Sequence, residues 1–116
     1  MDTINQNTNS LHDQAMHLAN LAVKTIENNP SQTKIYFQEA FLLEQKAAMT
    51  LVNDFDTEPS RSVLFRSAAH LALKAELYRE AERMAAFGLS GNPPTEIAIE
   101  LREVFSKSVQ HLKKVA

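Results

Sequence analysis

Cysteine is absent from this chain of 116 residues. Without thiols the chain can form neither disulfides nor thiolate metal sites, and the absence is consistent with a reducing compartment. No apolar run approaches the roughly 20 residues that cross a bilayer. The first ten residues also lack the charged and then apolar pattern of a secretory signal. We therefore predict a cytoplasmic protein without a membrane segment.

The sequence signatures of catalytic sites are also missing. Only two glycines occur, so there is no glycine-rich phosphate loop, and no GxSxG nucleophile motif is present. None of the histidines falls in an HExxH motif or follows a glutamate at the Glu-x-x-His spacing of di-iron bundles. These histidines are His12, His17, His70 and His111. We therefore predict a protein that is not an enzyme, with no metal and no cofactor.

An overall basic charge is lacking as well, since the net charge is -2. Such a balance makes general nucleic-acid binding unlikely, because that function needs a basic domain or a concentrated basic stripe. The charge is unevenly distributed: residues 1–58 carry 3 basic and 8 acidic side chains, a net -5, and the remainder carries 9 and 6, a net +3. Opposite charges can hold the two halves together or face different partners. The sequence leaves both possibilities open.

Helical periodicity dominates the chain, and strand-type alternation is missing. With 44% hydrophobic residues, the chain has the length and composition of one domain with a modest core. We predict an all-α fold of about five helices arranged as antiparallel hairpins. The predicted organisation is a flexible N-terminal tail over residues 1–9 and a single helical domain over 10–116. This domain comprises a hairpin over 10–53, a second hairpin over 58–91 and a final helix over 94–114.

Capping residues and breakers set these boundaries. Ser10 is a suitable N-cap for the first helix, and Pro30 with the two asparagines before it ends that helix. Thr57 is a suitable N-cap for the third helix, with Pro59 in its first turn. Pro94 can occupy the first turn of the last helix.

Apolar residues nearly encircle the third helix, which predicts that it packs against neighbours on several sides. They are Val63, Leu64, Phe65, Ala68, Ala69, Leu71, Ala72 and Leu73. In the second helix, the residues predicted to face inward are Phe37, Ala40, Phe41, Ala47, Ala48, Leu51 and Val52. The third helix is therefore the predicted centre of the fold.

Residues 62–95 resemble one tetratricopeptide repeat (TPR), a hairpin of two antiparallel helices. The bulky, small, aromatic and proline positions of that motif are filled by Phe65, Ala68, Ala69, Tyr78, Ala81, Gly88 and Pro93. Small side chains let two helices cross closely, and aromatic rings fill the space beside them. The same segment is similar to small bacterial TPR-like proteins. The resemblance implies that residues 58–91 form a TPR-like hairpin and that the helix over 94–114 is its capping helix.

The TPR resemblance also implies a binding groove. The groove positions of the family correspond here to Val63, Arg66, His70, Leu73 and Lys74. Arg66, His70 and Lys74 are four residues apart, so they stack on one helix face. In the family, basic and amide residues at such positions hold acidic C-terminal tails, although this chain has histidine where the tail-binding version favours asparagine. The resemblance therefore implies an adaptor that binds an acidic or C-terminal protein segment, whereas a solvated helix face is the alternative interpretation of the stripe.

Three further interpretations stay open. Met16, Ala19 and Val23 give the first helix extra apolar surface, which would suit a homodimer. Arg66 could instead form a structural ion pair with an acidic residue of the N-terminal half. The alternative from a different class is a small helical nucleic-acid-associated protein, either HEPN-like, on the Arg66 and His70 pair, or an antitoxin-type partner.

Overall fold

The structure is a computed structural model, and it describes residues 6–115. Within that range the chain forms five α-helices and one short 3-10 helix, with no strand, so the predicted all-α fold is confirmed. The α-helices are α1 (Gln6–Thr25), α2 (Pro30–Met49), α3 (Ser60–Lys74), α4 (Tyr78–Leu89) and α5 (Thr95–Val115), and the 3-10 helix is η1 (Phe55–Thr57).

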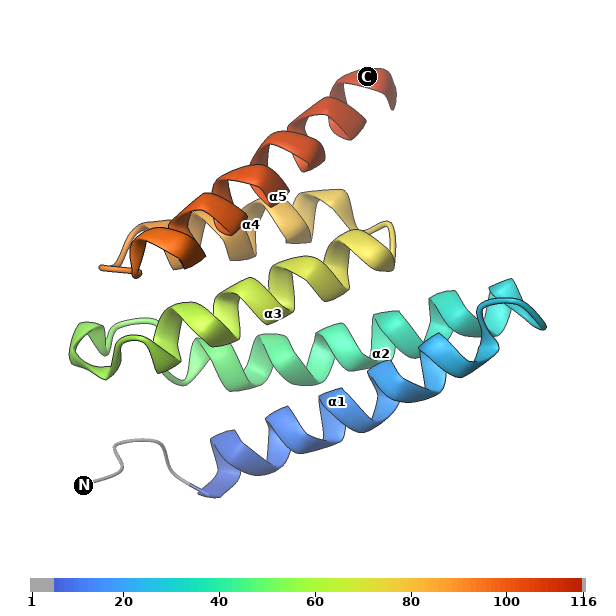
Figure 1. Cartoon of the computed structure of the whole chain (residues 1–116), viewed down its shortest axis with the longest axis horizontal. Coiled ribbons are helices and arrows are strands. Elements are labelled where there is room, and N and C mark those ends of the chain that lie inside the picture. The colour runs from blue at the N-terminus through green and yellow to red at the C-terminus, as the bar shows by residue number, and fades with distance from the viewer. Residues whose placement is uncertain (1–5, 116) are drawn as a thin grey trace.

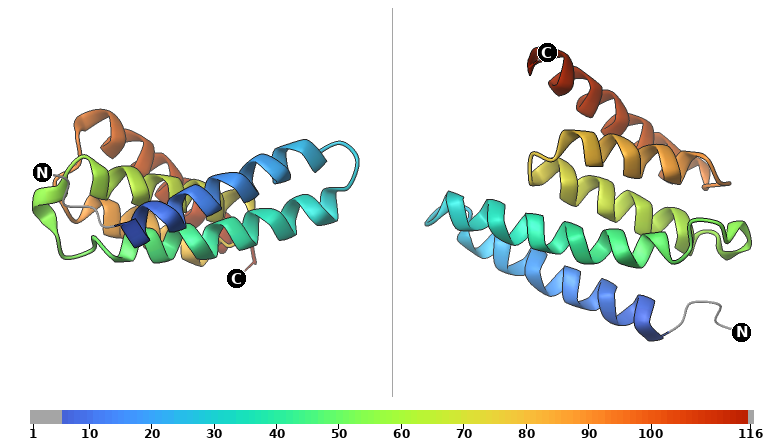
Figure 2. Two further views of the ribbon diagram at one scale, coloured as in Figure 1. Left: turned by 90° about the horizontal axis from the view of Figure 1, so that it is seen from below. Right: turned by 180° about the vertical axis from the view of Figure 1, so that it is seen from behind.

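The helices stack side by side in chain order, and each runs antiparallel to the one before it (Figure 1). Helix α3 lies in the middle and contacts α2, α4 and α5, so its predicted central place is confirmed. Helices α1, α3 and the first part of α5 lie toward one face of the stack, whereas α2 and α4 lie toward the other (Figure 2). The molecule therefore has two distinct helical faces.

Small residues let the helices approach closely at the core. Alanines of α2, α3 and α4 are fully buried at these contacts, namely Ala40, Ala47, Ala48, Ala68, Ala69, Ala72, Ala81 and Ala85. Gly88 serves the same purpose, because a Cβ there would lie 2.8 Å from Leu101 Cδ1 and 3.1 Å from Phe65 Cβ. The close approach of α5 to the hairpin of α3 and α4 therefore depends on glycine at this position.

A buried guanidinium joins the two hairpins at one end of the stack. Arg61 is completely inaccessible to solvent and lies between the rings of Phe55 and Phe65, with its Cζ 4.9 and 5.0 Å from their centroids. Its Nε and Nη2 donate to the carbonyl of Val52 at 3.1 and 3.0 Å, and Nη2 also donates to the carbonyl of Phe87 at 2.9 Å. Arg61 therefore ties the end of α2 to the end of α4.

The loop before α5 closes over this guanidinium. A Cβ on Gly91 would lie 3.0 Å from Arg61 Cζ and 3.0 Å from Glu58 Oε2, so glycine is needed for the loop to pass there. Glu58 accepts hydrogen bonds from the backbone N–H groups of Ser62 at 2.9 Å and Asn92 at 3.1 Å. Burial lowers the pKa of Arg61, and the Glu58 carboxylate opposes that change. Arg61 belongs to the same helix as the basic stripe of Arg66, His70 and Lys74, but its role is internal.

Two predicted helix starts were wrong. Helix α1 already includes Gln6, so Ser10 is not its N-cap and the predicted tail over residues 1–9 is too long. Residues 1–5 of that tail lie outside the described part of the chain. The early turn of α1 is held by tertiary contact, since Thr8 is buried and its Oγ1 lies 2.8 Å from Thr50 Oγ1.

Helix α3 starts at Ser60, three residues after the predicted N-cap Thr57. The Thr57 hydroxyl instead donates to the carbonyl of Asp54 at 2.7 Å and closes η1. Glu58 takes over the capping role by accepting from the N–H of Ser62.

The turn between α3 and α4 lies at Glu76, where the backbone has a φ of 62°. The Glu76 carboxylate is 2.8 Å from Lys34 Nζ of α2, so an ion pair joins this turn to the first hairpin. No helix within residues 6–115 combines the length and hydropathy that a bilayer span needs.

Candidate functional site

The five predicted groove residues all lie on α3, but they face different neighbours. Val63 lines a hollow of about 160 Å³ between α3 and α1, together with His12. Leu73 packs against the hydrophobic core. Arg66 and His70 turn toward α5, whereas Lys74 reaches α2, where its Nζ lies 5.5 Å from the centroid of the Phe37 ring. The three basic residues therefore follow one another along α3, whereas Val63 and Leu73 have other neighbours and do not join them in one groove.

Arg66 forms an ion pair across the fold. Its Nη1 donates to Glu100 Oε2 of α5 at 2.9 Å, with 33% and 46% of the two side chains exposed. The structural pair with an acidic residue of the N-terminal half, which the sequence left open for Arg66, is wrong, because α5 packs on α3 at this point and supplies Glu100 instead.

His70 lies within the electrostatic reach of several charged side chains. Burial is the main reason why its pKa falls below the ordinary value of 6.5. The Glu100 carboxylate raises the pKa, whereas the cations of Lys74, Arg66 and Lys107 lower it further. His70 is therefore neutral near pH 7, beside three permanent cations.

Lys107 and Glu100, both of α5, are the members of this site that the sequence did not reveal. Lys107 is exposed and near enough to His70 to affect its pKa. We define the basic surface as Arg66, His70, Lys74, Lys107 and Glu100. At neutral pH it holds three cations against one carboxylate, a net charge of +2, so it attracts an anionic group.

The chemistry available at the basic surface is anion binding. The Arg66 side chain is one-third exposed, and an incoming carboxylate can share or replace its bond to Glu100. Lys74 and Lys107 supply mobile ammonium groups at the edges of the surface, because both side chains are exposed. His70 can add a donor when it gains a proton.

A second polar cluster, formed by His12 and Glu44, is not among the sites predicted from the sequence. The Nδ1 of His12 lies 2.8 and 3.0 Å from the two carboxylate oxygens of Glu44, and Glu44 is completely buried. Burial raises the pKa of Glu44 above 4.5, whereas Ser67 and His12 lower it. The sequence did contain a signal, because Glu44 falls in the same helical stripe as Phe37 and Leu51.

The described part of the chain contains no group of three histidine, aspartate or glutamate side chains that could hold a metal ion. Comparison of the chain with protein families, with curated proteins and with solved structures found no match. The function must therefore be inferred from the surfaces of the chain itself.

Proposed function

We propose that this protein is a non-catalytic interaction module, a TPR-like adaptor that binds an acidic protein segment through the basic surface on α3 and α5. The observation that carries the proposal is the convergence of Arg66, Lys74 and Lys107 around His70. One helix alone would give only a row of basic residues, which is common on solvated faces. Lys107 comes from a second helix, α5, so the basic residues form a surface and not a single row. A partner chain that lies across α3 and α5 can contact this surface.

The neighbouring charges support an acidic partner rather than an apolar one. Glu100 already occupies Arg66 at 2.9 Å, which shows that a carboxylate fits against this guanidinium. A partner carboxylate would compete with Glu100 and would meet the two lysines at the edges. The contacts would be largely solvent-exposed, so we expect affinity to come from several weak charge pairs and not from one.

Affinity capture from a lysate of the native cells tests this proposal. The tagged wild-type chain is compared with a Lys74→Glu, Lys107→Glu double variant, and bound proteins are identified by mass spectrometry. The matched control is Lys24→Glu, Lys113→Glu, which changes the net charge equally at two exposed lysines outside the basic surface. We expect a partner with an acidic segment to bind the wild type and the control but not the double variant.

A synthetic peptide of that acidic segment then gives the affinity directly, by fluorescence anisotropy. We expect at least a tenfold loss for the Lys74→Glu, Lys107→Glu variant, because two attractive contacts become repulsive. Equal affinities for the double variant and the control would rule out the basic surface as the binding site.

The cations of the basic surface also support a second candidate function, that of a small nucleic-acid-associated protein. Phosphates would meet Arg66, Lys74 and Lys107 as readily as carboxylates do. Titration of single-stranded and double-stranded oligonucleotides beside the acidic peptide, at one fixed salt concentration, distinguishes the two. Both ligands would bind through exposed charges and weaken as salt rises, so the affinities are compared directly, and tighter binding of an oligonucleotide than of the peptide would favour the nucleic-acid-associated candidate.

A further inference from the structure

Helix α2 presents an exposed stripe that the fold leaves uncovered. Leu42 and Ile35 are 56% and 45% exposed, and Glu39 and Lys46 are also exposed. At 100° per residue these four side chains lie within an arc of about 60° around the helix. We define the α2 stripe as Ile35, Glu39, Leu42 and Lys46. Two of its residues are large and apolar, and they are seven residues apart, the spacing at which a helix meets another helix.

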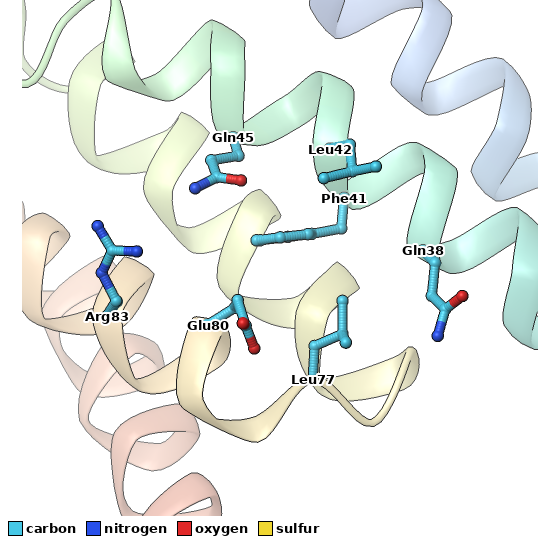
Figure 3. A pocket seen from close by; sticks show the side chains of 7 residues that line it. All are labelled: Gln38, Phe41, Leu42, Gln45, Leu77, Glu80 and Arg83. Atoms are coloured by element: carbon cyan, nitrogen blue, oxygen red, sulfur yellow. The ribbon is translucent and has the colours of Figure 1, made fainter.

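A groove runs beside the α2 stripe. It is about 460 Å³ in volume and lies between α2 and α4 (Figure 3). Phe41 forms its floor, and Leu42 and Leu77 add apolar walls, with Glu80 and Arg83 on the α4 side. The groove therefore offers apolar surface next to Leu42 into which a side chain of another helix can fit.

The charges of the α2 stripe are complementary to themselves. Glu39 and Lys46 are seven residues apart on one face, and neither makes an ion pair within the described part of the chain. When two such helices run antiparallel with a two-fold axis opposite the Leu42–Leu43 peptide, Glu39 of each copy lies level with Lys46 of the other. The same symmetry brings the two Leu42 side chains together at the axis.

We infer that α2 is a dimerisation helix whose partner is a second copy of this chain. The two α2 helices pack antiparallel, Leu42 of each copy fits beside the groove of the other, and two Glu39 to Lys46 ion pairs flank the axis. Glu39 and Lys46 set the antiparallel orientation, because a parallel pair in register would place Glu39 beside Glu39 and Lys46 beside Lys46. A contact made by one helix pair and its adjoining groove is small beside the roughly 800 Å² per partner of a standard interface. We therefore expect a weak dimer that forms only at high concentrations of the chain.

Self-association through α1, which the sequence suggested, has less surface available. Met16 and Ala19 pack against the core, and only Val23 of that set is exposed, at 57%. Helix α2, which carries the stripe, also lies toward the other face of the stack from α3 and the first part of α5, as the two views in Figure 2 show. Dimerisation at α2 therefore leaves the basic surface open, and the inference does not depend on the proposed function.

Sedimentation velocity from micromolar to millimolar chain tests the inference. We expect the wild type to dimerise, and we expect Glu39→Lys and Lys46→Glu each to weaken the dimer about tenfold, because the two-fold axis repeats each repulsive contact. The Glu39→Lys, Lys46→Glu double variant restores opposite charges across the axis and should return the dimer to wild-type strength. Leu42→Glu should abolish it. All four changes are at exposed positions, and circular dichroism checks that each variant is folded.

Glu27→Lys and Lys24→Glu are the matched controls, because they make the same charge changes on exposed residues near the end of α1. A wild type that stays monomeric at every concentration would overturn the inference. A dimer that survives Leu42→Glu would overturn it too, since the contact would then lie elsewhere. Failure of the double variant to recover would contradict the antiparallel pairing.

Discussion

At the scale of single residues, Glu44 is the most unusual member of the core. Its carboxyl group is fully buried on α2 and contacts the imidazole of His12 on α1. Burial raises the pKa of Glu44 above 4.5. The folded chain therefore binds this proton more tightly than the unfolded chain does. As pH rises from about 4.5 through the folded pKa, the contribution of Glu44 to the free energy of unfolding falls.

Replacement of His12 by leucine tests this environment. The His12→Leu variant leaves the buried carboxyl group of Glu44 without its hydrogen-bond partner, so we expect a loss of roughly 1–3 kcal/mol in the free energy of unfolding at pH 7. The loss should shrink at pH values below 4.5, where Glu44 is protonated in both the folded and the unfolded chain. Urea unfolding at the two pH values measures it. His17→Leu, an exposed histidine of the same helix, is the control, and equal losses in both variants would contradict the role of His12.

His70 gives the basic surface a pH dependence with a definite sign. Burial first, and then Lys74, Arg66 and Lys107, lower its pKa below 6.5 in the free protein. A bound carboxylate would raise that pKa, so the complex binds the proton more tightly than the free protein does. Affinity for an acidic peptide should therefore rise as pH falls between 8 and 5. In a His70→Gln variant the anisotropy titrations should show a flatter profile, whereas His111→Gln should keep the wild-type slope.

At the scale of helices, the ion pair between α3 and α5 is a weak connection. Arg66 and Glu100 are both partly exposed, so solvent screens their attraction. We expect a coupling energy of about 0.2–1 kcal/mol from a double-mutant cycle with Arg66→Ala and Glu100→Ala, measured by urea unfolding. The packing of Leu101 and Val104, both almost fully buried, holds α5 instead. A coupling energy well above that range would mean that the pair anchors α5 and cannot be shared with a ligand.

The number of helices and the buried side of α2 could be predicted from the sequence, because apolar residues that recur about every 3.6 positions mark the buried side of a helix. Helix starts were predicted less well. Thr8 of α1 is held by Thr50, which is 42 residues away, and no local signal reveals such a contact. The burial of Arg61 could not be predicted for the same reason. Its partners Val52 and Phe87 come from the ends of α2 and α4, which only the folded chain brings to it. Lys107 joined the candidate site for the same reason, since only the packing of α5 on α3 places it near His70.

At the scale of the whole molecule, the two inferred surfaces belong to different helices, and α2 lies toward one face of the stack while α3 lies toward the other (Figure 2). A dimer through α2 would present two basic surfaces pointing apart, so it could hold two acidic segments at once. We expect Leu42→Glu to leave the affinity for a single dissolved peptide unchanged. On a surface densely coated with that peptide, the variant should dissociate at least tenfold faster than the wild type, because it cannot rebind through a second site. Biolayer interferometry at low and high coating density measures both cases, and equal dissociation rates would contradict a bivalent dimer.

The buried guanidinium of Arg61 also determines where the stack can flex. It fastens the ends of α2 and α4 together at one end of the molecule, whereas the two hairpins are joined at the other end by the exposed pair of Lys34 and Glu76. Bending of one hairpin against the other should therefore pivot at Arg61 and open at the far end. Amide hydrogen exchange would then be slowest on both sides of the Arg61 junction and fastest toward the turn between α1 and α2.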